Sequence, residues 1–215
     1  MLGVSAATLL TRAVTLVIAF TVHEFCHAWT ATALGDSTPR ANGRLTLNPL
    51  AHLDPIGSLL LLLVGFGWAK PVPVDPYALQ RRTPAGLMLV SAAGPFSNLV
   101  LAIVAAIPLQ AGLASLADLG VSASWLPTPA QFLGEFIFIN LILFFFNLVP
   151  LAPLDGEKVL GYFLPPSGQE ALQRLQPYGP MILLAVLFLG PRLGLDVFHW
   201  IVGLPALTVF NLLVS

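Results

Sequence analysis

The chain is unusually poor in charged side chains for a protein of 215 residues. Only 9% of its residues are Asp, Glu, Lys or Arg, whereas soluble domains carry about 25%. Hydrophobic residues make up 57%, and the mean hydropathy is +0.87. So few polar side chains cannot cover a water-facing surface. The composition therefore excludes an ordinary soluble domain and predicts an integral membrane protein.

Other absences narrow the function further. Nine Lys and Arg against ten Asp and Glu give a formal net charge of −1, so no basic excess indicates nucleic-acid binding. The single cysteine, Cys26, excludes an intrachain disulfide. No basic leader precedes the first apolar run, so we expect a retained membrane helix there and no cleavable signal peptide. We find no internal repeat and no appended soluble domain.

The apolar runs predict an all-α polytopic membrane protein, because about 20 apolar residues cross a bilayer as a helix. About five membrane-spanning helices are expected at approximately 4–34, 85–109, 132–149, 181–189 and 197–214. The apolar run 56–68 is too short to span, which predicts a re-entrant or interfacial helix. Alternation over 42–49 predicts a strand in a small β-hairpin element. Closely spaced prolines predict an extended segment over 69–76.

Basic residues in the loops predict the orientation. Region 35–84 contains five Lys or Arg, region 110–130 contains none, and region 150–178 contains two. Since cytoplasmic loops are enriched in Lys and Arg, regions 35–84 and 150–178 are expected on the cytoplasmic side. The amino terminus is then external and the carboxyl terminus internal.

Three ionisable residues lie close together in the first apolar run, within the stretch FTVHEFCHAW. His23, Glu24 and His27 form an HExxH pattern, and residues four apart share one face of a helix. Both imidazoles can therefore bind one Zn²⁺, which lowers the pKa of bound water to about 7, while Glu24 can accept its proton. The alternative is a chance pentapeptide, or histidines that are satisfied by hydrogen bonds inside the bundle. An ionisable side chain in a membrane costs roughly 2.5 kcal/mol or more, which favours a metal site.

Catalytic zinc requires a third protein ligand at a similar depth. His23 and His27 lie roughly 10–17 Å from the cytoplasmic end of their helix, by helical rise. Asp155 follows the third apolar run on the same side, in NLVPLAPLDG, where prolines break the helix and Gly156 allows close backbone packing. Asp155 is therefore the predicted third ligand. Alternatively, it caps the next helix while its neighbours face solvent.

Three motifs together resemble the site-2 proteases, which are intramembrane zinc metalloproteases. They are HEFCH at 23–27, AGPFSN at 93–98 and NLVPLAPLDG at 147–156. The resemblance implies a minimal member without a PDZ or regulatory domain. It implies a single transmembrane metalloprotease domain at 1–215, with a catalytic core at about 4–165 and additional C-terminal helices at about 178–215. It also implies one Zn²⁺ per chain, bound by the two histidines and the aspartate, with Glu24 as catalytic base.

The same resemblance assigns roles to residues of the second and third motifs. Asn147 is implied to hold substrate or the developing oxyanion, as an amide donor near the metal can. Asn98 is implied to be a polar residue near the site; alternatively, it makes an interhelical hydrogen bond. Gly94 and Pro95 are implied to shape close helix contact. Ala152 and Glu157 depart from the family pattern in positions that bear on substrate preference.

Two further segments carry lesser predictions. His52 and Asp54 form a possible accessory metal or gating pair, but Asp54 before Pro55 also suits a helix cap, which we favour. The predicted strand at 44–49 offers an edge to which an extended substrate could add; an ordinary surface hairpin explains it equally well.

The predicted function is hydrolysis of peptide bonds in transmembrane segments of membrane proteins, in regulated intramembrane proteolysis. The expected partners are a transmembrane protein substrate and membrane lipid, and the expected location is a prokaryotic plasma membrane. The alternative is a non-hydrolytic metal-binding carrier, or an inactive relative that binds membrane proteins. Glu24 discriminates between them, because a carrier has no use for a general base beside its ligands.

Overall fold

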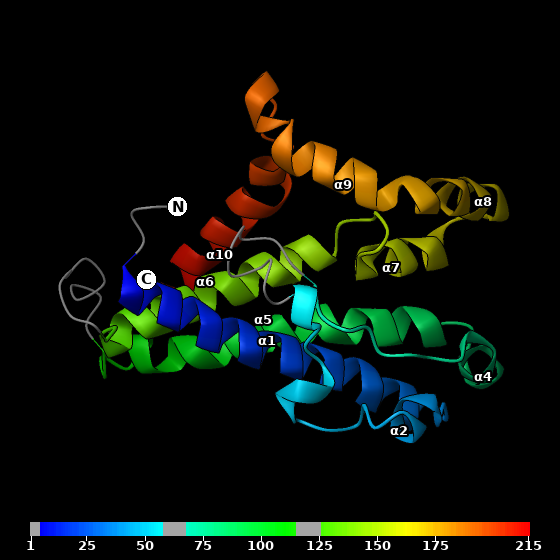
Figure 1. The fold of residues 1–215 in the computed structure, drawn as a ribbon, viewed down its shortest axis with the longest axis horizontal. Helices are drawn as coiled ribbons and strands as arrows, with labels where there is room; N and C mark the ends of the chain where they lie inside the picture. The colour runs from blue at the N-terminus through cyan, green and yellow to red at the C-terminus, as the bar shows by residue number, and fades with distance from the viewer. Residues whose placement is uncertain (1–4, 58–67, 115–125) are drawn as a thin grey trace.

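The computed structural model describes residues 5–57, 68–114 and 126–215. These ranges are mostly helical and contain no sheet (Figure 1). The long helices are α1 (Ala6–Ala33), α5 (Gly86–Gln110) and α6 (Pro129–Asn147). The shorter α-helices are α2 (Thr38–Ala41), α4 (Pro76–Arg82), α7 (Asp155–Phe163), α8 (Pro166–Leu175), α9 (Gly179–Phe188) and α10 (Leu204–Val214). Short 3-10 helices occupy Pro49–Ala51, Gln176–Tyr178 and Pro191–Leu193, and a π-helical turn, His199–Gly203, leads into α10.

The three long helices are the part of the described chain that is long and apolar enough to cross a membrane. They have 28, 25 and 19 residues, and they confirm the first three predicted spans. α5 packs against both α1 and α6, so the three lie side by side (Figure 1). The C-terminal ends of α1 and α6 and the N-terminal end of α5 share one end of this bundle, near α7.

Small side chains fill much of the bundle interior, and many large apolar side chains are exposed. On α1, Ala19, Ala28 and Ala31 are fully buried, whereas Leu10 and Val14 are 46% and 39% exposed. The cluster that joins α5, α6 and α10 is likewise rich in alanine. Close helix packing through small residues, with an apolar exterior, is the pattern of helices surrounded by lipid.

The last two predicted spans are helices too short to count as membrane-spanning by length. α9 has 10 residues, and the helix His199–Val214 falls in the class of apolar helices of 10–17 residues, below the length of about 20 needed to cross a bilayer. Between them, a Cβ at Gly190 would overlap the carbonyl oxygens of Val186 and Leu195, and Gly194 has a φ of 74° that favours glycine. The chain therefore turns sharply here and cannot continue as one long helix.

The predicted strand at 42–49 is wrong, because this segment is made of turns and irregular backbone. Gly43 has a φ of 67°, Thr46 Oγ1 accepts a hydrogen bond from Asn48 N, and Asn48 Oδ1 accepts one from Leu50 N. These local bonds occupy groups that a strand would need. An isolated bridge joins Leu53 to Ala69 instead. Without a strand at 44–49, the predicted edge for substrate addition is also absent. The predicted helix at 56–68 lies mostly outside the described residues.

Of the segment predicted to be extended, 69–76, residues 69–75 form no helix, as the prolines predict, whereas Pro76 already begins α4. Buried polar groups attach residues 69–75 to the loops after α1. Arg44 is 6% exposed and donates hydrogen bonds to the carbonyl oxygens of Ala51, Lys70 and Pro71. Asp36 accepts a bond from Asp75 N at 2.7 Å. The segment is thereby held beside the ends of α1 and α5, where it forms one wall of the site.

Candidate metal centre

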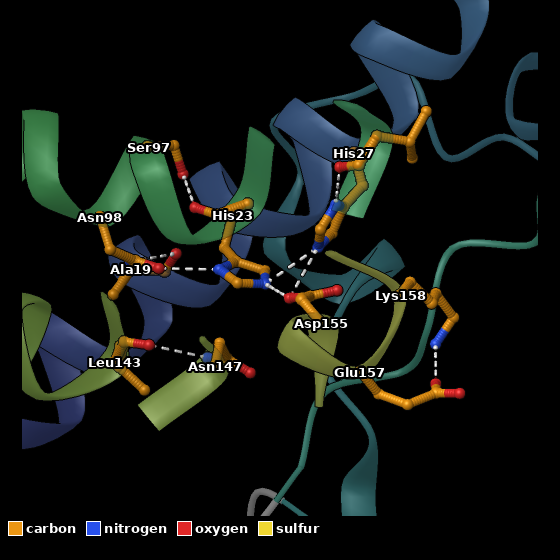
Figure 2. Close-up of polar contacts among 12 residues, drawn as sticks. Ala19, His23, His27, Ser97, Asn98, Leu143, Asn147, Asp155, Glu157 and Lys158 are labelled. Atoms are coloured by element: carbon orange, nitrogen blue, oxygen red, sulfur yellow. Dashed lines mark hydrogen bonds and ion pairs between the residues drawn. The ribbon is translucent and has the colours of Figure 1, made fainter. Parts of the chain in front are cut away.

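His23 and His27 project from one face of α1, and their Nε2 atoms lie 3.0 Å apart (Figure 2). His27 Nδ1 donates a hydrogen bond to the Val90 carbonyl oxygen at 2.7 Å. His23 Nδ1 donates to Asn98 Oδ1, also at 2.7 Å. With the proton on Nδ1, the Nε2 atom of each neutral ring carries a free lone pair. Both lone pairs are therefore directed into the same small space.

α5 positions these rings through three residues that are one turn apart. Val90 and Asn98 provide the two acceptors, and Gly94 lies midway between them. A Cβ at Gly94 would overlap the Nε2 atoms of His23 and His27, so only glycine lets the rings lie against the helix. Val90, Gly94 and Asn98 follow one another at intervals of four residues on α5, the same interval that separates His23 from His27 on α1. α5 can therefore place Gly94 against the two rings and Asn98 beside His23.

Asp155 completes the cluster from the start of α7. Its Oδ2 lies 3.2 Å from Nε2 of His23 and 3.4 Å from Nε2 of His27 (Figure 2). Gly156 allows this approach, since a Cβ there would overlap the carbonyl oxygens of Leu148 and Val149. Burial by itself would raise the pKa of the Asp155 carboxyl, but charge attraction to His27 and His23, when the rings carry a proton on the facing nitrogen, outweighs burial and lowers the pKa below its ordinary value. The anionic carboxylate thus attracts positive charge, a proton or a metal ion, into the space between it and the rings.

The donor set fits zinc. Three electron-rich atoms that point at one another repel unless a cation or proton lies between them. In a tetrahedral site with bonds of about 2.0–2.2 Å, ligating atoms are about 3.3–3.5 Å apart. The observed separations of 3.0, 3.2 and 3.4 Å are close to this value. Within the described ranges, His23, His27 and Asp155 form the one cluster of three side chains placed to hold a metal ion.

A cavity of about 890 Å³ opens in front of the cluster. Glu24 lines it, is 8% exposed, and receives no hydrogen bond from the described residues. Its carboxylate is therefore available to water or substrate beside the metal-binding atoms. The cavity continues along α1 to Leu9, past Arg12, which pairs with Glu135 of α6 at 3.1 Å. Its mostly apolar walls include Leu16, Phe20, Phe138, Ile142, Phe146 and Leu187.

The two asparagines predicted near substrate occupy different environments. Asn147, the last residue of α6, lines the cavity and donates one hydrogen bond from Nδ2 to the Leu143 carbonyl oxygen at 3.0 Å (Figure 2). Asn98 is fully buried and does not line the cavity. Its carbonyl oxygen faces His23, in keeping with the interhelical hydrogen bond considered above. The substrate role of either residue stays a prediction.

Sequence reasoning missed Asn140, a second fully buried asparagine beside the site. Its Oδ1 accepts a hydrogen bond from Asn98 Nδ2 at 2.9 Å, and its own Nδ2 donates to the Phe136 carbonyl oxygen at 2.9 Å. The signal was a lone amide inside the apolar run 136–146, because polar side chains within membrane helices usually contact another helix.

His52 and Asp54 lie outside both the metal cluster and the cavity lining. His52 is fully buried, with its Nε2 atom 2.7 Å from the Thr46 carbonyl oxygen. Asp54 Oδ1 accepts hydrogen bonds from the backbone nitrogens of Ile56 and Gly57. These contacts are those of a helix cap, which is the interpretation of Asp54 that the sequence favours.

Comparison with known proteins agrees with this geometry. Residues 110–190 match the model of Peptidase family M50. The chain is 42% identical over 178 residues to "Putative zinc metalloprotease YwhC" of Bacillus subtilis (strain 168), covering 83% of this chain and 80% of that protein. It is 34% identical over 183 residues to "Putative zinc metalloprotease Rip2" of Mycolicibacterium smegmatis, covering 80% of this chain and 64% of that protein. A Mycobacterium tuberculosis (H37Rv) protein of the same name is 33% identical over 193 residues, covering 87% and 71%. No solved structure matches.

The first of these relatives is similar over most of both chains, so the likeness extends beyond the segment matched by the family model. The segment matched by the family model includes Asp155 but not the HExxH residues. In the structure, His23 and His27 lie beside Asp155. Three apolar helices and the M50 match together identify an integral membrane protein. The chain belongs to the site-2 protease family, peptidase family M50, and is a zinc-dependent protease.

Proposed function

We propose that this protease is an intramembrane endopeptidase that hydrolyses peptide bonds within transmembrane segments of membrane proteins. The observation that carries the proposal is the position of the metal cluster and Glu24 in the wall of a mostly apolar cavity. Two candidate membrane spans, α1 and α6, provide much of that wall. From His27 to Arg12 the cavity follows α1 for about 22 Å by helical rise, enough for an apolar peptide segment of several residues.

His23, His27 and Asp155 are the residues proposed to hold Zn²⁺. The chemistry that the bound ion supplies is Lewis acidity toward water and toward a peptide carbonyl group. Glu24 accepts a proton from the attacking water as the new C–O bond forms on the scissile carbonyl carbon. It then donates that proton to the leaving nitrogen as the C–N bond breaks. Asn147 Nδ2, which uses one N–H on Leu143, donates its other N–H to the carbonyl oxygen or to the substrate backbone.

We further propose that the site faces the cytoplasm of a prokaryotic cell. The support is the excess of Lys and Arg in regions 35–84 and 150–178, which adjoin the end of the bundle that carries the site. The relatives named above are bacterial proteins. α9 and the helix 199–214 expose large apolar side chains such as Met181 and Leu212, which suits burial in lipid as a fourth and fifth membrane element.

The test is to map the cleaved bond in a designed transmembrane peptide that is reconstituted with the protein in lipid vesicles. Mass spectrometry of the products should place the cut within the apolar segment. Cleavage should stop when a chelator removes zinc and return when zinc is restored. Cuts confined to the water-exposed flanks, or cleavage that persists without zinc, would contradict the proposal.

A further inference from the structure

The Asn140 side chain is an amide at the centre of a membrane-spanning helix with no exposed surface. It does not line the cavity, so it cannot contact substrate there. Both ends of its amide are nevertheless used. Oδ1 accepts from Asn98 Nδ2 at 2.9 Å, and Nδ2 donates to the carbonyl oxygen of Phe136 at 2.9 Å. Asn98 in turn accepts from His23 Nδ1 at 2.7 Å.

The direction of this chain of hydrogen bonds is set by its far end. The backbone oxygen of Phe136 can only accept, so the donor end of the Asn140 amide must face it. The acceptor end of Asn140 then faces Asn98, which must present its own NH₂ group there. That group also points to the Ala19 carbonyl oxygen, at 3.4 Å, which is again only an acceptor. The carbonyl oxygen of Asn98 is thereby left to face His23.

We propose that Asn140 is a positioning residue that fixes the tautomer of His23 through Asn98. With Asn98 Oδ1 facing the ring, His23 carries its proton on Nδ1 and directs the lone pair of Nε2 toward Asp155 and His27. If the Asn98 amide were reversed, its NH₂ would face Nδ1 and favour the tautomer whose proton lies on Nε2. That tautomer cannot bind a metal through Nε2. The proposal rests on the proposed role of His23 as a zinc ligand.

The two histidines are controlled in different ways. His27 donates directly to the Val90 backbone oxygen, which cannot reverse. His23 donates to a side-chain amide, whose nitrogen and oxygen ends are almost equal in shape. Only the hydrogen bond from His23 to the Asn98 amide needs another residue to determine which end of the amide faces the ring. Asn140 therefore matters for His23 and not for His27.

A matched pair of substitutions separates hydrogen bonding from shape. In Asn140→Thr, the hydroxyl can donate to the Phe136 carbonyl oxygen and still accept from Asn98. Thr11, Thr21, Thr32 and Thr208 already bond to the carbonyl oxygen four residues earlier in this way. In Asn140→Val, a methyl group replaces that hydroxyl and can do neither. We expect the Val variant to weaken zinc binding by about 10- to 100-fold, the usual effect of losing an outer partner of a metal ligand, and the Thr variant to stay closer to wild type.

Zinc affinity is measured by chelator competition on the purified full-length protein. Leu141→Ala is the packing control, because Leu141 is equally buried on α6 but is not bonded to Asn98. It should lower thermal stability and leave the zinc dissociation constant unchanged. Equal losses of affinity in the Thr and Val variants, or none in either, would overturn the proposal.

A second measurement does not depend on zinc or on cleavage. Nitrogen-15 NMR of the histidine rings reports which nitrogen carries the proton, and the chain has only four histidines. In zinc-stripped wild type, whose helical circular dichroism is checked first, His23 should carry a proton on Nδ1, with or without a second proton on Nε2 facing Asp155. In Asn140→Val the population with a proton on Nδ1 should fall for His23 but not for His27. A wild-type His23 without a proton on Nδ1 would overturn the proposal even if no variant folds. His23→Ala that retains zinc would instead contradict the proposed function.

Discussion

Replacing Gly94 by alanine should damage the metal centre more than any other single methyl group added to α5. An ideal Cβ at this position lies 2.6 Å from Nε2 of His23 and closer still to Nε2 of His27. Ordinary contacts between non-bonded heavy atoms are about 3.5–4.0 Å, so helix or rings must move by roughly 1 Å. Metal sites tolerate ligand displacements of about 0.2 Å. The displacement is several times this tolerance, and the rings cannot swing aside without breaking their bonds to Asn98 and Val90.

We therefore expect Gly94→Ala to weaken zinc binding by at least about 100-fold, or roughly 2.7 kcal/mol. Overpacking should also reduce stability by about 1–3 kcal/mol. Chelator competition measures the first effect and thermal unfolding the second. Gly161→Ala is the control, because a Cβ there meets only Leu172 Cδ2, at 3.5 Å. Zinc affinity and cleavage at wild-type levels in Gly94→Ala would refute the geometry described here.

Three further predictions follow from the same contacts. Asp155→Ala should abolish stoichiometric zinc, measured by elemental analysis, while helical circular dichroism is retained; stoichiometric zinc in this variant would exclude Asp155 as an essential ligand. Removal of zinc by a chelator should lower the midpoint of thermal unfolding, since a ligand at 1,000 times its dissociation constant stabilises the native state by about 4 kcal/mol. An unchanged midpoint would contradict the claim that the folded state binds zinc. Glu135→Gln should destabilise the packing of α1 on α6, and exchanging the charges of Arg12 and Glu135 should restore part of the loss. The coupling energy between the two residues should be about 1 kcal/mol or less, because both side chains are partly exposed. A coupling energy of zero in thermal unfolding would show that the 3.1 Å pair does not stabilise the fold.

The first three spans could be predicted to within about three residues because each is a long apolar run with clear end signals. The start of α6 shows the limit of hydropathy alone. The apolar run begins at Phe132, but the helix begins three residues earlier at Pro129. Its start is set by a capping box between Thr128, the N-cap, and Gln131 in the first turn. The bounds of the short C-terminal helices were harder to predict, since hydropathy does not reveal where glycines allow a sharp turn between two helices.

The predicted ligands come together in space, although Asp155 lies 132 residues from His23 in the chain. That proximity could be anticipated because zinc requires a third ligand and the two segments end at the same depth. The orientation of Asn98 and the presence of Asn140 could not, because a sequence does not show which end of an amide faces which neighbour. The strand at 42–49 failed for a related reason. Alternation of apolar residues does not reveal that Thr46 and Asn48 bond to their own backbone.

Glu24→Gln separates metal binding from hydrolysis when it is compared with wild type for both zinc content and cleavage of a transmembrane peptide. The amide keeps the size of the side chain and leaves the three ligands untouched, but it cannot accept a proton from water. We expect one zinc per chain in both proteins and cleavage by the wild type alone. Cleavage by Glu24→Gln at the wild-type rate would contradict the mechanism proposed here.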